Sequence, residues 1–104
     1  MTRYLVSRHP GAWQWFAQQG IAIDRVVTHL HPGLPRTGDV VYGTLPVAVM
    51  AKLQRRGVGV YLLVLDVPAH LRGCELSAAD MHACNARLEH YRVWRVTHAP
   101  VGEL

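Results

Sequence analysis

The features that mark secreted, membrane or tail-like proteins are missing from this chain. It has no apolar run of about 18 residues, the length that a membrane-spanning helix needs. Its first residues contain no long apolar segment of the kind found in a signal peptide. It also has no run of about five like charges that would form a nucleic-acid-binding tail. We therefore expect a cytoplasmic protein that does not enter a membrane and does not bind long nucleic acids.

Cysteine and lysine are also scarce. The two cysteines, Cys74 and Cys84, fit neither a CxxC motif nor a zinc-ligand spacing, so we expect reduced structural thiols and no bound metal. Lys52 is the one lysine among eleven basic residues, and the other ten are arginines. Arginine presents a planar fork that suits phosphate, and the formal net charge is +4. The composition therefore favours an anionic partner.

What the chain does have is the composition of one folded domain. Half of its 104 residues are apolar and 17% are charged, so we expect a single domain over residues 1–104. Apolar runs predict strands at residues 3–7, 24–30, 39–42, 58–65 and 92–97. Helices should lie between them and end near Gly20, Gly57 and Tyr91.

This alternation predicts an α/β fold, with a mostly parallel five-stranded sheet and helices on both of its faces. The connection between the second and third strands is short for a parallel crossover, so that pair could be antiparallel.

Local signals refine the helices. Thr44 is a suitable N-cap for the second helix, with Pro46 in its first turn. Ser77 and Asp80 form a capping-box pattern at the start of the last helix. The spacing of Met81, Cys84, Leu88 and Tyr91 would give that helix its buried stripe. The first helix takes its pattern from Trp13, Phe16 and Ala17, and we assign Trp13, Trp15 and Trp94 to the core or to a dimer interface.

Polar groups gather where the predicted strands end. In open parallel sheets, ligands bind outside the carboxyl ends of the strands, where helix N-termini offer free N–H groups to phosphate. The candidates that follow the first, third and fourth strands are Ser7, Arg8, His9, Pro10 and Gly11; Gly43, Thr44, Leu45 and Pro46; and Asp66 and Arg72. Hydroxyl, guanidinium and imidazole groups predominate, so the sequence predicts a phosphate-binding edge.

Familiar cofactor motifs are absent from this edge. The chain has neither a Walker sequence nor GxGxxG, and Asp66 has no second carboxylate beside it to hold magnesium. We expect no cofactor and, if a phosphodiester is cut, chemistry without a metal.

Three stretches resemble a known family. Residues 4–12 (YLVSRHPGA), 38–46 (GDVVYGTLP) and 71–77 (LRGCELS) resemble small stand-alone CRISPR-associated proteins of type III systems. The resemblance implies a ring nuclease with one Rossmann-like domain, related to the domains that sense cyclic oligoadenylate. It further implies a homodimer that binds this second messenger, expected to be cyclic tetra-adenylate, and cuts it to linear products that end antiviral signalling.

By this resemblance Ser7, Arg8, His9, Thr44 and Arg72 face the ligand. Arg8 and Arg72 could stabilise charge on the phosphate, and His9 could act as a general base or a general acid. Two alternatives use the same residues or the same charge. One is a sensor or sponge that binds cyclic oligoadenylate without cutting it, and the other is a small basic RNA- or DNA-binding protein.

Overall fold

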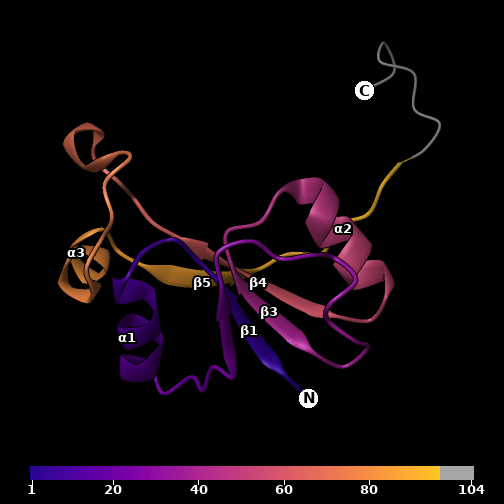
Figure 1. Cartoon of the computed structure of the whole chain (residues 1–104). Helices are drawn as coiled ribbons and strands as arrows, with labels where there is room; N and C mark the ends of the chain where they lie inside the picture. The colour runs from indigo at the N-terminus through magenta and orange to yellow at the C-terminus, as the bar shows by residue number, and fades with distance from the viewer. Residues whose placement is uncertain (97–104) are drawn as a thin grey trace, which may run out of the picture.

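The computed structural model describes residues 1–96 of the chain. Within this range a five-stranded sheet lies between helices that cover its two faces (Figure 1). The predicted α/β class and the predicted order of strands and helices are confirmed. No helix in the described range combines the length and the apolarity needed to cross a bilayer.

The sheet is mixed. Its strands are β1 (Arg3–Val6), β2 (Arg25–Val27), β3 (Val40–Gly43), β4 (Gly59–Val64) and β5 (Arg87–His90), in the spatial order β2-β1-β3-β4-β5. β1 pairs in parallel with β2 and with β3, and β3 pairs in parallel with β4. The last strand, β5, runs antiparallel to β4. The expectation of a mostly parallel sheet is corrected by this antiparallel edge.

The second and third strands do not pair with each other. They lie on opposite sides of β1, and both are parallel to it. β2 ends at Val27 rather than at Leu30, so residues 28–39 are free to connect it to β3. A connection of about a dozen residues is long enough for a parallel crossover, which explains why the suggested antiparallel pair does not form.

Two of the three α-helices end at the predicted glycines. The helices are α1 (Gly11–Gln18), α2 (Val47–Arg55) and α3 (Ala78–Ala83), with a short 3₁₀ helix, η1 (Ala69–Leu71), before α3. Gly20 and Gly57 follow α1 and α2 with φ of +75° and +81°, a conformation that glycine adopts without a steric penalty.

The start of α2 differs from the prediction. Pro46 occupies the N-cap position, and no side chain caps the helix. Proline disfavours the helical conformation in the residue before it, so Leu45 and Thr44 stay outside the helix. Thr44 is therefore not the N-cap, and the prediction for that residue is wrong.

The last helix begins as predicted and ends early. Ser77 Oγ accepts from the Asp80 N–H at 3.1 Å, and Asp80 Oδ2 accepts from the Ser77 N–H at 3.0 Å, which confirms the capping box. Asn85 then takes a positive φ of 54° and breaks the helix. The chain continues as β5, in which Leu88 lies opposite Leu63 on β4.

The predicted extension of α3 to Tyr91 is therefore wrong, and Tyr91 is exposed. The strand predicted at residues 92–97 is also wrong, because residues 92–96 are not in a strand; Thr97 lies outside the described residues.

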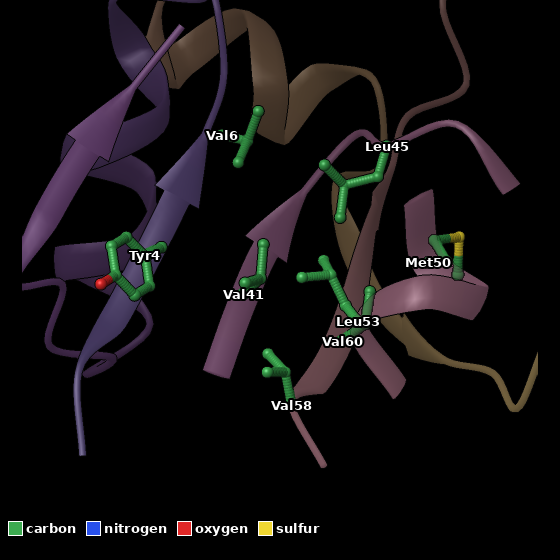
Figure 2. Close-up of a cluster of buried hydrophobic side chains, with 8 residues drawn as sticks. All are labelled: Tyr4, Val6, Val41, Leu45, Met50, Leu53, Val58 and Val60. Atoms are coloured by element: carbon green, nitrogen blue, oxygen red, sulfur yellow. The ribbon is translucent and has the colours of Figure 1, made fainter. Parts of the chain in front are cut away.

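Apolar side chains form a core on each face of the sheet. One cluster joins β1, β3 and β4 to α2, and Figure 2 shows its eight buried residues: Tyr4, Val6, Val41, Leu45, Met50, Leu53, Val58 and Val60. The other cluster joins Leu5 and Leu63 to α1 and α3. Neighbouring residues of β1 point to opposite faces, so Tyr4 and Leu5 enter different clusters. As a result α2 covers one face, and α1 and α3 cover the other (Figure 1).

Candidate functional site at the carboxyl ends of the parallel strands

The loops that follow β1 and β3 leave the same edge of the sheet in opposite directions. β1 and β3 are parallel neighbours, so their carboxyl ends lie side by side. The loop of residues 7–10 leads to α1 on one face, and the loop of residues 44–46 leads to α2 on the other. In α/β sheets, ligands bind where successive connections diverge in this way. The structure thus places the predicted phosphate-binding edge at such a position.

The β1–α1 loop is held by a short set of hydrogen bonds. The His9 N–H donates to Ser7 Oγ at 3.1 Å, which closes a turn directly after β1. The Leu76 N–H donates to Nδ1 of His9 at 3.2 Å, and the Gly11 N–H donates to the Leu76 carbonyl at 3.1 Å. Leu76 is buried, so its backbone groups gain partners that water does not supply. One residue of the segment before α3 therefore fixes both His9 and the start of α1.

Glycine is required at position 11 by this contact. A Cβ on Gly11 would lie 2.2 Å from the carbonyl carbon of Ser77 and 2.2 Å from the nitrogen of Ala78. Both are backbone atoms, which cannot move away as a flexible side chain would. The Gly11 N–H is already bonded to Leu76, so Gly11 contributes to the site as a point of close packing between two segments.

The hydrogen bond from Leu76 assigns the tautomer of His9. Nδ1 accepts a hydrogen bond from a backbone N–H and so carries no proton, which places the proton of the neutral ring on Nε2. Neutral His9 therefore offers Nε2 as a hydrogen-bond donor. Placing a proton on Nδ1 would remove the acceptor that Leu76 uses.

Two cavities meet at this loop. The first, of about 440 Å³, is lined by both Arg8 and His9 from the β1–α1 loop and by Arg72 and Glu75 from the segment between η1 and α3. The second, of about 430 Å³, is also lined by Arg8, His9 and Glu75. Ser7 and Pro10 line the second cavity. The three predicted catalytic residues, Arg8, His9 and Arg72, are thus brought together around one cavity.

The other predicted residues lie outside both cavities. Thr44 and Pro46 are exposed, and Leu45 belongs to the core cluster beside α2. Gly43 is packed against β1, where a Cβ would lie 2.0 Å from the Val6 carbonyl oxygen. The β3–α2 loop is next to the β1–α1 loop, but its side chains do not line the cavities that Arg8 and His9 share.

Asp66 is engaged at another part of the sheet edge. Its carboxylate accepts from Asn85 Nδ2 at 3.1 Å and from an Arg87 guanidinium nitrogen at 3.2 Å. The hydrogen bond from Asn85, followed by that from Arg87, lowers the pKa of Asp66 below its ordinary value. These contacts join the end of β4 to the start of β5, and Asp66 lines neither cavity.

Trp13 and Glu75 are among the cavity residues that were not predicted for the site. Trp13 lines the second cavity and is 60% exposed, so it does not belong to the core of the single chain. Trp94 is exposed as well, whereas Trp15 is buried as predicted, and a dimer interface at Trp13 or Trp94 stays a prediction. Ala12, Trp15 and Phe16 provide the buried stripe of α1, and their spacing leaves Trp13 on the outer side of the helix. Glu75 lines both cavities, but a single acidic residue gives no sequence signal.

The family described as "Putative CRISPR-associated protein (Cas_VVA1548)" matches residues 4–94. The chain belongs to this family. The match covers the three stretches on which the family resemblance rests, so CRISPR association is confirmed. No curated protein and no solved structure matches the chain.

Basic side chains predominate among the charged groups at the first cavity of this CRISPR-associated protein. Arg8 and Arg72 are exposed at the first cavity and form no ion pair within residues 1–96. Guanidinium groups bind phosphate oxygens with two parallel hydrogen bonds, and His9 adds a third donor through Nε2. Among the described residues no three His, Cys, Asp or Glu side chains are grouped as metal ligands would be. The groups at hand can thus bind a phosphodiester and stabilise added negative charge.

Proposed function

We propose that this protein is a ring nuclease that binds cyclic oligoadenylate, with cyclic tetra-adenylate as the expected ring, and cuts it to linear products. The observation that carries the proposal is the meeting of Arg8, His9 and Arg72 around one cavity at the carboxyl ends of the parallel strands. The CRISPR-associated family supports the biological setting. The type III system and the cyclic substrate come from the resemblance of the three sequence stretches.

The proposed reaction uses a nucleophile that the substrate carries. The 2′-oxygen of one nucleotide attacks the adjacent phosphorus, forms a P–O2′ bond and releases its proton to solvent. The P–O5′ bond breaks, and the 5′-oxygen takes up a proton from solvent. The product is a linear oligoadenylate with a 2′,3′-cyclic phosphate at one end and a 5′-hydroxyl at the other. No metal, water molecule or oxidant is consumed.

The protein contributes positioning and charge stabilisation to this reaction. Holding the 2′-oxygen in line with the P–O5′ bond can supply roughly 7–11 kcal/mol of the barrier. Arg8 and Arg72 come from two different segments, so they can bind the non-bridging oxygens from two sides. Both side chains are exposed in the absence of ligand. They would lose hydration once the phosphate is bound, and their attraction to it would then be stronger.

His9 acts in this proposal as a hydrogen-bond donor. A general base would need an unprotonated Nε2, and the neutral ring would then carry its proton on Nδ1 and lose the bond from Leu76. The tautomer held by Leu76 instead directs an N–H at the developing negative charge, on a non-bridging oxygen or on the departing 5′-oxygen. Because of this one backbone hydrogen bond, we assign His9 the role of a hydrogen-bond donor in this proposal rather than that of a general base.

The proposal includes a homodimer. Each cavity has a volume of about 430–440 Å³, which suits one nucleotide better than a ring of four. A two-fold dimer would offer two copies of the site to a ligand of matching symmetry.

The activity is tested by product analysis. Pure protein in EDTA is incubated with cyclic tetra-adenylate and, separately, with cyclic hexa-adenylate, and the products are separated by chromatography. We expect linear products that carry a 2′,3′-cyclic phosphate. Arg72→Ala should slow cleavage about 100-fold or more, whereas Arg55→Ala, on the outer side of α2, should not. Tight binding without conversion would favour a sensor or sponge, and the absence of binding would exclude this ligand class.

A further inference from the structure

An exposed tryptophan adjoins the proposed phosphate site. Trp13 lies in the first turn of α1 and is 60% exposed, although its neighbours Ala12 and Trp15 are buried. It lines the second cavity together with Ser7, Arg8 and His9 from the loop that precedes it. Val26, from the edge strand β2, lines the same cavity and is 47% exposed. Two large apolar side chains are therefore open to solvent within one cavity that also contains phosphate-binding groups.

We propose that Trp13 is the stacking platform of a nucleobase subsite, in which the base lies against the indole and its phosphate lies toward Arg8. The inference rests on the proposed function, since the base belongs to the oligonucleotide that the site would cut. The phosphate and base positions are adjacent because Arg8 and His9 line both cavities. The second cavity, of about 430 Å³, has room for one nucleotide rather than for a larger segment of nucleic acid.

The charge distribution supports this division of the site. Arg8 and Arg72 attract the phosphate to the first cavity, whereas Glu75, which lines both cavities, repels it. A carboxylate is an acceptor and binds the exocyclic amino group of adenine. Uracil has no such group. The subsite should therefore bind any base through Trp13 and should favour adenine over uracil through Glu75.

The stacking contact can be observed directly. The chain has three tryptophans, so its ¹H–¹⁵N spectrum contains three indole signals, which the Trp13→Phe and Trp94→Phe variants assign. The protein is titrated with cyclic tetra-adenylate and, separately, with adenosine monophosphate. We expect the Trp13 indole to shift in both titrations, while Trp94, exposed in a different part of the chain, does not shift.

The two proposals fail in different ways in this experiment. If cyclic tetra-adenylate is bound and cut and the Trp13 indole does not shift, the nucleobase subsite is wrong and the ring nuclease stands. If adenosine monophosphate shifts Trp13 but cyclic tetra-adenylate neither binds nor is cut, the subsite stands and the ring nuclease is wrong. If neither ligand shifts Trp13 or binds, both are wrong.

Variants measure the size of the contact. Trp13→Ala should weaken binding of cyclic tetra-adenylate roughly 5- to 150-fold, the range found for loss of one stacked base, and Trp13→Phe should retain most of the affinity. Trp94→Ala is the matched control and should bind as the wild type does. Wild-type affinity in Trp13→Ala, or a changed oligomeric mass that identifies Trp13 as an interface residue, would overturn the inference.

Discussion

The loops after β1 and β3 begin side by side and differ in how they are held. The β1–α1 loop is fixed by Leu76, which bonds to both His9 and Gly11. The β3–α2 loop has one long backbone hydrogen bond to a distant segment, from the Thr44 N–H to the Val6 carbonyl at 3.4 Å. Its Pro46 carbonyl accepts only from Val49 and Met50 of the following helix, and that helix has no side-chain cap. Arg8 and His9 of the first loop line the cavities, whereas Thr44 of the second does not.

The difference follows from the face of the sheet that each helix covers. α1 shares its face with α3, so the segment that leads into α3 reaches the β1–α1 loop and bonds to it. In the described range no second helix packs on the face that α2 covers; the loop residues Leu30 and Val93 pack there instead. When two helices pack on one face of the sheet, the loop that leads into one helix can bond to the segment that leads into the other. In this protein, helix placement rather than strand position decides which strand end gains hydrogen-bond partners from a second segment.

The largest effect is expected for His9. His9→Ala should slow cleavage of cyclic tetra-adenylate about 100- to 1,000-fold, because it removes a donor to the developing charge. Thr44→Ala should remain near the wild-type rate. Single-turnover kinetics at saturating ligand measures both variants. Equal losses in the two variants would remove the distinction between the loops.

A second substitution separates the structural role of His9, as acceptor for the Leu76 N–H, from its proposed role as a donor to the ligand. His9→Asn retains an acceptor that the Leu76 N–H can reach, but it lacks the Nε2 donor. It should restore most of the stability that His9→Ala loses, about 1–3 kcal/mol for an unpaired buried N–H, without restoring cleavage. Recovery of cleavage in His9→Asn would contradict the donor role.

Gly11→Ala should be the next largest disturbance. The added methyl group meets the backbone of Ser77 and Ala78 at 2.2 Å, so the loop and α3 must separate. We expect a loss of about 1–3 kcal/mol in the free energy of unfolding, together with weaker ligand binding. Gly20→Ala is the control: it adds the same atom at a positive φ with nothing within 4 Å, and should cost about 1 kcal/mol. Urea unfolding measures both, and a Gly11→Ala midpoint at or above that of Gly20→Ala would contradict the close contact.

Removal of the α3 cap should have a smaller effect. Ser77→Ala loses the bond from the Asp80 N–H, which typically lowers stability by about 1 kcal/mol. Because Leu76 directly precedes this cap, the loss should also loosen the β1–α1 loop. Amide hydrogen exchange of Leu76 and Gly11 should become faster, while that of Met50 in α2 should not. Equal acceleration at all three positions would indicate global unfolding instead.

The pH dependence should be the smallest effect. The backbone N–H and hydroxyl of Ser77 lower the pKa of Asp80, so its folded-state pKa lies below its unfolded value of about 3.9. The stability from this bond is present above about pH 4 and is lost as pH falls through the folded pKa. Asp39, bonded to the N–H groups of Arg36 and Thr2, shifts in the same direction. The free energy of unfolding should therefore fall less between pH 6 and about pH 3 in Asp80→Asn than in the wild type. If the urea midpoints of the two proteins fall by the same amount over this range, the prediction is contradicted.

Much of the fold could be predicted from local patterns. The apolar runs predicted the first four strands and missed the last one. Gly20 and Gly57 marked the ends of two helices correctly. The last strand was missed because Met81, Cys84, Leu88 and Tyr91 fit a helical spacing. Pairing of β5 with the edge of β4 outweighs that spacing. Asn85 was the available signal, since asparagine adopts positive φ more readily than most residues.

The site was predictable only in part. Arg8, His9 and Arg72 were predicted for the site because they follow strands, and the structure brings them to one cavity. Asp66 also follows a strand, yet its position was not enough to show its partners, Asn85 and Arg87. Those partners lie on the segment that was mistaken for helix, so an error in secondary structure hid an ion pair.

The sequence by itself determined the α/β class, the order of the elements up to α3, the capping box at Ser77 and the presence of Arg8 and His9 in the loop after β1. These depend on local spacing and on the side chains present. The tertiary structure alone decided that β5 is antiparallel, that α1 and α3 share a face, and that Leu76 holds His9 in one tautomer. Each of these depends on contacts between segments far apart in the chain, and such contacts form only when the sheet brings the segments together.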